Sequence, residues 1–324
     1  MKRKYGVGRC DSDVVIARLD VAFASICQLR LVYCHNDDIW DLRFHWAARR
    51  AQTVARLRSG RYALSPVRVV GTRNGHRVTV WSALDAVVLK ALSLALTPVV
   101  QRRVDRRCHH VRGHGGLKGA INHCHQAIPG HVFVLKSDVA DFYASMDHEV
   151  LMSACRTLTC DKSLLDLIAQ YMTRMEITNG RYHAPDRGII KGCPLSPLMG
   201  AIVLSALDRA IPKACAYIRY MDDWVILTKT RGMLRRVIKI MHQVMRQLKF
   251  KLAPSKTFIG RIAPGFDFLG YRMNDQGVIS LAQQTIKRHA EKLLTLYEHC
   301  ASNQRVQQYK MHWQRWVKAG LNKK

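Results

Sequence analysis

Acidic residues are scarce in this chain. Its 324 residues include 52 Lys and Arg but only 23 Asp and Glu, so the formal net charge is +29. A chain with so little negative charge attracts polyanions, and nucleic acid is the first polyanion to consider. The deficit therefore favours a protein that binds nucleic acid.

Long apolar runs and a secretory signal are also missing. No apolar run reaches the ~18–20 residues that span a bilayer, and the basic residues 2–4 are not followed directly by an apolar segment. We therefore expect no membrane partner and a cytoplasmic location. The hydrophobic content of 48% is that of a folded globular protein, and the length suits two or three subdomains.

Paired cysteine motifs are absent as well. The ten cysteines include no C-x-x-C pair, so we expect reduced, mostly buried thiols. One stretch rich in Cys and His, residues 108–125, has metal-capable side chains, but its spacing matches no familiar zinc pattern. A basic loop that faces RNA is the favoured interpretation of this stretch.

Two of the few acids are adjacent. Asp222 and Asp223 lie between residues 217–220 and 224–227, which alternate as strands do, and residues 221–223 predict the tight turn between them. A hairpin tip with two carboxylates suits a divalent metal. Asp is also an ordinary turn residue, so the motif alone leaves both interpretations open.

A third carboxylate ends another predicted strand. Residues 132–138 form an apolar run that stops at Asp138. A carboxylate at the end of a buried strand is costly unless a cation neutralises it. The alternative, capping of the following helix, fits Asp147 better than Asp138.

Helices and further short strands are expected around these motifs. Residues 74–75, Asn-Gly, predict the turn of a hairpin between 66–70 and 77–81, and 252–258 and 266–272 are expected to be short strands. Helix formers and apolar spacing predict helices over residues 48–58, 84–96, 119–127, 161–175, 196–210, 234–248 and 282–324.

Positive charge concentrates in several segments. The four arginines of the short helix 48–58 cannot all find acidic partners, so we expect a solvated face or phosphate contacts. Residues 102–118 combine Arg, His and Gly, which predicts a phosphate-contacting loop. The loop at 188–195 is punctuated by glycines that permit close ligand approach, and Ser196 and Pro197 are good N-cap and N1 residues for the next helix.

Taken in order, these motifs resemble a reverse transcriptase of the bacterial type, the group that includes group II intron, retron and diversity-generating enzymes. The matching segments are the first catalytic-aspartate motif at 138–143, the G-x-x-x-S-P loop at 192–197, the Y-x-D-D (here YMDD) box at 220–223, the lysine at 256 and the primer-grip F-L-G-Y at 268–271.

The resemblance covers roughly residues 60–275 and implies an α+β right-hand polymerase. Its palm would be an antiparallel sheet packed on helices. The implied boundaries are an N-terminal helical extension at 1–60, fingers at 61–130, a palm at 131–275 with a fingers-contacting segment at about 160–195, and a short helical thumb at 276–324.

The resemblance also implies an RNA-directed DNA polymerase that uses two Mg²⁺ ions and dNTPs, with an RNA template and a DNA product. Asp138, Asp222 and the Val139 carbonyl would ligate the metals, and Asp223 would help shape the site. Lys256 would stabilise or protonate the pyrophosphate leaving group.

Further residues are assigned to the substrates by the same resemblance. Tyr143 would be the aromatic gate that excludes a 2′-hydroxyl, Arg73 and Arg77 would contact the triphosphate, and Lys191 and Gly192 would border the nucleotide. The residues assigned to template and primer are Ser196, Pro197, Phe268, Leu269, Gly270 and Tyr271.

Two departures from the family pattern point to a specialised element. Lys191 stands where most of these enzymes carry Gln. The usual Asp-Arg pair after the fingers hairpin is missing, the nearest match being residues 85–86, and no room remains for a maturase extension or an endonuclease. We expect a role in anti-phage defence or diversity generation, with a dedicated structured non-coding RNA.

Two alternatives remain at this point. One is a catalytically idle RNA-binding protein with the same fold, against which the intact Asp138, Asp222 and Asp223 argue. The other is a template-independent or RNA-synthesising polymerase, against which Tyr143 argues. A protein partner or a second copy of the chain is left open.

Overall fold

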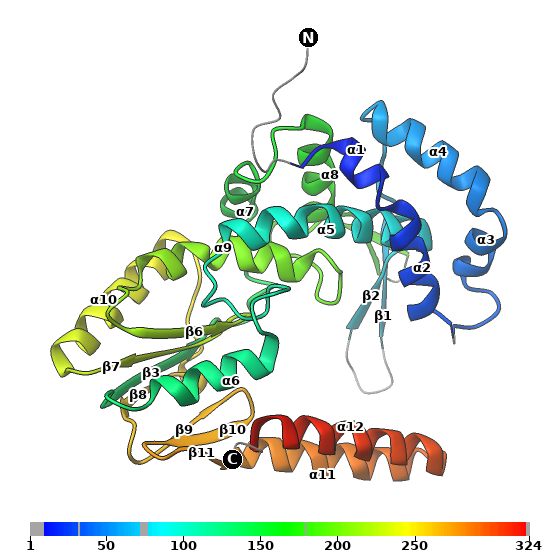
Figure 1. Cartoon of the computed structure of the whole chain (residues 1–324). Helices are drawn as coiled ribbons and strands as arrows, with labels where there is room; N and C mark the ends of the chain where they lie inside the picture. The colour runs from blue at the N-terminus through cyan, green and yellow to red at the C-terminus, as the bar shows by residue number, and fades with distance from the viewer. Residues whose placement is uncertain (1–9, 32, 72–76, 179, 322–324) are drawn as a thin grey trace. The chain divides into compact units, whose positions relative to one another are not determined.

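The computed structural model describes residues 10–31, 33–71, 77–178 and 180–321 (Figure 1). The chain divides into two compact units, each assembled from separate segments. Unit 1 comprises Met1–Val104, Asp141–Ala206 and Leu248–Phe250, and unit 2 comprises Asp105–Ala140, Leu207–Gln247 and Lys251–Lys324. The boundaries expected for fingers, palm and thumb stay a prediction.

The core of unit 1 is the apolar helix α5 (Ala83–Arg103). It packs against α1 (Ser12–Ile16), α2 (Leu19–Leu29) and α3 (Asp38–Phe44). Length and composition alone would let α5 cross a membrane, but 72% of its apolar window is buried, as in the core helix of a globular unit. The predicted core helix is therefore confirmed, and it continues to Arg103.

The basic helix α4 (Trp46–Arg58) also lies in unit 1 and ends, as predicted, at Ser59 and Gly60. Not all four of its arginines find acidic partners among the described residues, as expected, since Arg56 forms no ion pair there. Three of them form ion pairs: Arg49 with Asp41 at 3.3 Å, Arg50 with Asp20 at 2.9 Å and Arg58 with Asp13 at 3.8 Å. The acids belong to α1, α2 and α3, which folding brings beside α4.

A four-stranded sheet completes unit 1. The predicted hairpin is present as β1 (Val67–Gly71) and β2 (Arg77–Val80), and its turn, residues 72–76, lies outside the described residues. β4 (Glu176–Thr178) pairs with β1 in parallel, and β5 (Arg181–His183) pairs with β4. The β4–β5 hairpin was not expected from the sequence.

Three more helices belong wholly or partly to this unit. α7 (His148–Cys155) is capped by Asp147 as predicted, and α8 (Lys162–Met172) by Asp161. α9 spans Ser196–Ala210. Ser196 is its first helical residue rather than its N-cap, because its hydroxyl donates instead to the Ile190 carbonyl at 2.5 Å.

Unit 2 is built on an antiparallel sheet with the strand order β6-β7-β3-β8. The strands are β3 (Phe133–Asp138), β6 (Ala216–Tyr220), β7 (Asp223–Thr228) and β8 (Phe258–Arg261). The apolar side of α6 (Gly116–Ala127) packs on one face of the sheet, and α10 (Arg231–Gln247) packs on β3 and β7 from the other (Figure 1). The predicted α+β class, with an antiparallel sheet packed on helices, is confirmed.

The segment after α10 differs from the expected short strands. Residues 254–256 form a 3₁₀ turn, η1 (Pro254–Lys256), because Pro254 has no N–H to give to a strand ladder. Residues 266–272 form a hairpin, since Leu269 and Gly270 turn at φ 49° and 88° between β9 (Phe266–Phe268) and β10 (Tyr271–Asn274). β11 (Gly277–Leu281) completes this small sheet.

The chain continues with two helices, α11 (Gln283–Glu298) and α12 (Asn303–Leu321), as the sequence predicts. They run side by side (Figure 1), and the ring of His289 stacks on Trp313 with centroids 3.7 Å apart. All ten cysteines are free and six are buried, which confirms the predicted mostly buried thiols.

Candidate active site

The site residues predicted from sequence form two groups. Unit 2 holds Asp138, Val139, Asp222, Asp223, Lys256 and the primer-grip residues 268–271, whereas unit 1 holds Tyr143, Lys191, Gly192, Ser196 and Pro197. Arg73 lies outside the described residues. Arg77 opens β2, and its side chain lies outside the described part of the structure.

Strand register brings the carboxylates together. Asp138, the last residue of β3, pairs directly with Asp223, the first residue of β7. Asp222 lies in the turn between β6 and β7, preceded by Met221 at φ 58°. This turn has two residues rather than the expected three, because Tyr220 pairs with Asp223. Carboxylates from two strands thus meet at one end of the sheet.

The environment of these acids disfavours their charged forms. Burial, together with the neighbouring Asp138 carboxylate, raises the pKa of Asp222 to about 6. Burial also raises the pKa of Asp223 to about 7, although Lys136 opposes the shift. A site that must hold two or three carboxylates near neutral pH needs additional positive charge.

The available oxygens suit a hard divalent cation. Oδ1 of Asp138 and Oδ1 of Asp223 are buried and have no hydrogen-bond partner among the described residues. Val139 and Leu252 form an isolated antiparallel bridge, in which the hydrogen bonds are made by the residues beside them. The Ala140 N–H donates to the Lys251 carbonyl, and the Ala253 N–H donates to the Asp138 carbonyl. The ladder therefore leaves the Val139 carbonyl unused. Carboxylate and carbonyl oxygens are ligands that Mg²⁺ prefers.

Lys256 supplies one positive charge to this group. Its ammonium forms an ion pair with Asp138, and this hydrogen bond raises the pKa of Lys256. In the described part of the chain, no three His, Cys, Asp or Glu side chains are already placed to hold a metal ion together. The residues fit a divalent cation by their chemistry, and binding it requires side-chain rearrangement.

The turn that carries Asp222 is supported by residues that sequence reasoning did not assign. The Met221 N–H donates to Nδ1 of His110 at 2.9 Å. The guanidinium of Arg219 donates to the Met221 carbonyl at 2.9 Å, and it is completely buried in an ion pair with Asp208 at 2.5 Å. Burial opposes ionisation of Arg219, but Asp208 raises its pKa.

Part of the predicted phosphate-contacting loop has a structural role. Cys108 pairs with Arg219 of the edge strand β6 in an isolated parallel bridge. The Arg219 N–H donates to the Arg107 carbonyl at 2.9 Å, and the His109 N–H donates to the Arg219 carbonyl at 2.8 Å. Cys108 and His109 are buried, so the expectation of an RNA-facing loop is wrong for them. No local sequence rule links residues 108–110 to residues 219–221.

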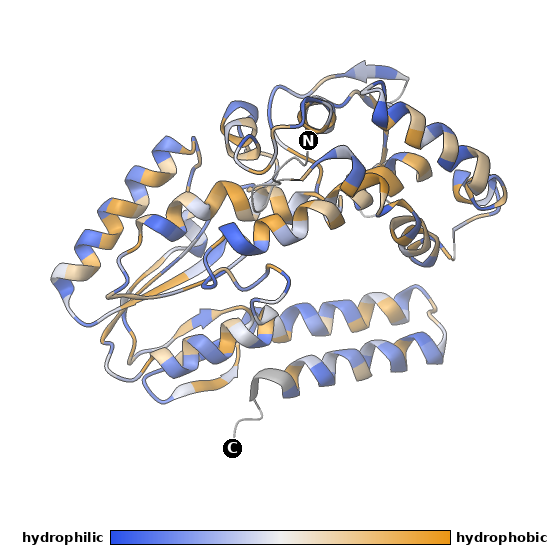
Figure 2. Ribbon diagram, turned by 45° about the horizontal axis from the view of Figure 1, so that its top comes forward, coloured by the Kyte–Doolittle hydropathy of each residue, from blue (hydrophilic) through white to orange (hydrophobic). Residues whose placement is uncertain are grey.

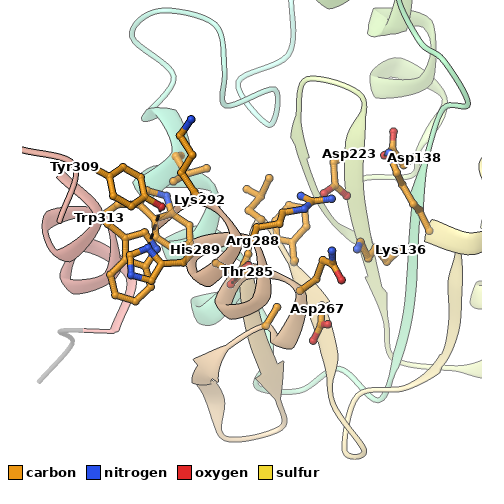
Figure 3. Close-up of a pocket in the computed structure, with 18 residues that line it drawn as sticks. Lys136, Asp138, Asp223, Asp267, Thr285, Arg288, His289, Lys292, Tyr309 and Trp313 are labelled. Carbon is orange, nitrogen blue, oxygen red and sulfur yellow. Dashed lines mark hydrogen bonds and ion pairs between the residues drawn. The ribbon is translucent and has the colours of Figure 1, made fainter. Parts of the chain in front are cut away.

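Asp138 and Asp223 open into a cleft of about 790 Å³. Asp138, Asp223 and Lys256 line one end, and Arg288 points into it from α11 (Figure 3). The far wall is formed by His289 and Lys292 of α11 and by Tyr309, Trp313 and Trp316 of α12. Their spacing of three and four residues places each set on one helix face, a signal the sequence contained. Stacked rings and cations together suit a nucleic-acid strand.

The predicted primer-grip hairpin lines this cleft with Asp267, Phe268 and the turn residues Leu269 and Gly270. Phe268 and Tyr271 are fully buried, and the Tyr271 hydroxyl donates to the Trp316 carbonyl at 2.7 Å. A Cβ on Gly270 would lie 2.8 Å from the Trp316 ring. The close approach of Trp316 therefore requires glycine at this position.

Unit 1 places Tyr143 beside the predicted nucleotide loop. The Ile189 N–H donates to the Tyr143 carbonyl at 2.8 Å, and Gly188 lies so close to Ala144 that an added Cβ would be 2.6 Å from its oxygen. Lys191 is exposed, and Gly192, at φ 93°, borders open space.

Ser196 occupies a different environment within the same unit. Its side chain is buried, and its hydroxyl lies 2.6 Å from the Tyr171 hydroxyl. The hydroxyl is therefore used inside the unit, where it holds the start of α9. Pro197 follows it in the first turn of that helix.

Comparison with known proteins identifies relatives of this chain. Protein YkfC of Escherichia coli is 24% identical over 235 residues, which cover 58% of this chain and 60% of YkfC. A retrovirus-related Pol polyprotein from a type-1 retrotransposable element R2 of Nasonia vitripennis is 24% identical over 163 residues, covering 46% of this chain and 16% of that protein. The chain thus spans less than two thirds of the length of these relatives.

A solved structure and the family match support the predicted fold and family. Telomerase from Candida albicans, solved with a fragment of telomeric RNA, superposes with a TM-score of 0.54 at 15% identity, over 80% of this chain and 54% of that one. The likeness supports the predicted right-hand polymerase fold. Residues 72–273 match the family described as reverse transcriptase (RNA-dependent DNA polymerase). Because this match covers more than half of the sequence, the chain belongs to the reverse transcriptase family.

Proposed function

We propose that this protein is an RNA-directed DNA polymerase that extends a primer with deoxynucleotides on an RNA template. The observation that carries the proposal is the direct pairing of Asp138 with Asp223 beside Asp222. It gathers three carboxylates at the end of one sheet, and Asp138 and Asp223 each have a buried oxygen without a hydrogen-bond partner among the described residues. A structural ion pair would not need unpaired oxygens of this kind.

In the proposed site, Asp138, Asp222 and the Val139 carbonyl hold two Mg²⁺ ions, and Asp223 shapes their surroundings. When bound, two such ions activate the primer 3′ oxygen and neutralise the phosphates. Lys256 keeps a proton on its amine, since its pKa is raised, and we propose that it gives this proton to the departing pyrophosphate.

The other predicted residues receive roles that match their surroundings. Tyr143 would exclude the 2′-hydroxyl, Gly192 would let the nucleotide approach the backbone, and Leu269 and Gly270 would contact the primer from the cleft. The buried Phe268, Tyr271 and Ser196 would act by holding these contacts in place. Pro197, Arg73 and Arg77 keep their predicted substrate contacts as part of this proposal.

Primer extension tests the catalytic proposal. With Mg²⁺, dNTPs and an RNA template, the wild-type protein should lengthen a labelled primer, and Asp222→Ala should not. Tyr143→Ala should admit ribonucleotides without loss of DNA synthesis. Equal extension by wild type and Asp222→Ala would contradict the assigned site. RNA binding without any extension by wild type would instead indicate a catalytically idle RNA-binding protein.

We also propose a dedicated structured non-coding RNA as partner, in anti-phage defence or diversity generation. The net charge of +29 supports a large polyanionic partner. The exposed Lys191, in place of the usual Gln, supports a specialised polymerase. Sequencing the RNA that co-purifies from the native host tests this: one enriched RNA species is expected, and a random sample of cellular RNA would refute it.

A further inference from the structure

A positive ridge runs along the exposed side of α10, away from the catalytic cleft lining. Arg231, Arg235, Lys239 and Arg246 are all exposed and follow one another at intervals of four, four and seven residues. On an α-helix these positions lie within about 80° of one another and extend over about 22 Å. We call these four residues the α10 ridge.

The ridge has no negative counterpart. From residue 224 to residue 266 the sequence contains ten Lys and Arg and not one Asp or Glu. Within the described residues, no ridge side chain forms an ion pair or a hydrogen bond. By contrast, Lys249 and Lys256 of the same stretch pair with Asp147 and Asp138. An ordinary solvated surface intersperses both signs of charge.

The apolar side of α10 is already used. Leu234, Val237 and Met241 are buried, and the helix packs on β3 and β7. Figure 2 shows the helix alternating between hydrophobic and hydrophilic residues. No large hydrophobic residue of α10 is exposed. A helix that binds a membrane must insert an apolar face, so the ridge suits phosphates rather than lipid.

We propose that the α10 ridge is a binding surface for the phosphate backbone of double-helical RNA, outside the catalytic cleft. Its cations are about 6 Å apart along the helix axis at the four-residue steps, a spacing comparable with that of neighbouring phosphates on a strand. The inference deepens the proposed structured RNA partner and rests on that part of the proposed function. It does not require polymerase activity.

The test compares two variants that lose the same charge. The ridge variant carries Arg231→Gln, Arg235→Gln, Lys239→Gln and Arg246→Gln. The control carries Arg18→Gln, Arg56→Gln, Arg61→Gln and Lys162→Gln, four exposed residues of unit 1. The probes are a labelled RNA hairpin with a long stem, a short primer–template and vesicles that contain phosphatidylserine.

The ridge variant should bind the hairpin at least about 10-fold more weakly than wild type at moderate salt. The slope of its log binding constant against log salt concentration should be smaller in magnitude by about four. The control should lose far less affinity, and both variants should extend the short primer–template as wild type does. A variant with Arg231→Lys, Arg235→Lys and Arg246→Lys should bind the hairpin as wild type does, because phosphates accept Lys as a point charge.

Several results would overturn the inference. They are unchanged hairpin binding by the ridge variant, an equal loss in the control, or a loss of vesicle binding in place of RNA binding. If wild type extends no primer but the ridge variant still binds the RNA hairpin more weakly than wild type, the catalytic proposal fails. The proposed RNA-binding role of the α10 ridge is then still supported. Melting temperatures of all variants, compared with wild type, exclude misfolding as the cause.

Discussion

At the scale of single residues, the buried pair of Arg219 and Asp208 links the stability of unit 2 to its chemistry. Both side chains are completely buried, and Arg219 also holds the Met221 carbonyl at the turn that carries Asp222. A buried ion pair gives little net stability, but removing one partner leaves the other charge buried and uncompensated. The turn that carries Asp222 therefore depends on a charge pair of which neither partner can be removed alone without cost.

Arg219→Ala should destabilise the protein by about 3–5 kcal/mol, because Asp208 would be left buried without its partner. Urea unfolding followed by circular dichroism measures this change. Lys239→Ala, at an exposed position, is the control and should stay within about 0.5 kcal/mol of wild type. A loss below 1 kcal/mol in Arg219→Ala would contradict the assignment.

Asp223 gives a prediction with a defined pH dependence. Its folded-state pKa of about 7 lies above the ordinary value of 3.8, so the folded protein holds a proton that the unfolded chain releases. This contribution favours folding at low pH and is lost as the pH rises through 7.

In EDTA at pH 8, Asp223→Asn should therefore melt about 2–4 °C above wild type. The advantage should shrink below pH 7 and vanish near pH 4. Mg²⁺ should raise the melting temperature of wild type more than that of the variant. If Asp223→Asn melts at a lower temperature than wild type in EDTA at pH 8, then the buried Asp223 carboxylate does not destabilise the folded protein as we infer.

At the scale of elements, periodicity and turn chemistry predicted most of the helices and the two key hairpins. Alternation revealed β6 and β7, and Asp147 revealed the start of α7, because these signals are local. η1 and the Leu269–Gly270 turn were missed, since both interrupt apolar runs that also suit strands. The ion pairs of Arg49 and Arg50 depend on acids in other helices, and the support from His110 depends on a contact across more than 100 residues.

Two glycines of the predicted nucleotide loop should respond differently to substitution by alanine. Gly188 and Gly192 both have positive φ, 83° and 93°, which costs an L-residue about 1–2 kcal/mol. Only Gly188 would also clash, with the Ala144 backbone. Gly188→Ala should unfold at markedly lower temperature, whereas Gly192→Ala should fold and lose nucleotide affinity. Similar melting curves for the two variants would refute the packing argument.

The facing sides of α11 and α12 should contribute to strand binding. Trp313→Ala removes a ring that stacks on His289 and lines the cleft, and loss of a base-stacking ring costs about 1–3 kcal/mol of binding. Fluorescence anisotropy with a primer–template should show about a 10-fold weaker affinity. Met311→Ala, exposed and outside the cleft lining, should bind as wild type does.

At the scale of the whole molecule, the net charge of +29 acts on the folded state itself. Like charges confined to a compact chain repel one another and lower its stability. Salt screens this repulsion over a Debye length of about 10 Å at 0.1 M. The protein should therefore be more stable when its charge is screened or matched.

Raising NaCl from 50 to 500 mM should increase the melting temperature by a few degrees, and heparin at low salt should do the same. Differential scanning fluorimetry measures both effects. A fall in melting temperature with NaCl would mean that ion pairs such as Arg50–Asp20 outweigh the global repulsion.

The central position of β3 has a consequence during synthesis on the ribosome. This apolar strand ends at Asp138, but its neighbours β7 and β8 are completed only at Thr228 and Arg261. About 120 residues must be added before both edges are covered, which takes roughly 6–25 s at typical translation rates. The nascent chain thus exposes an unpaired strand that other chains can join. Cells that make this protein quickly should need chaperones to shield it.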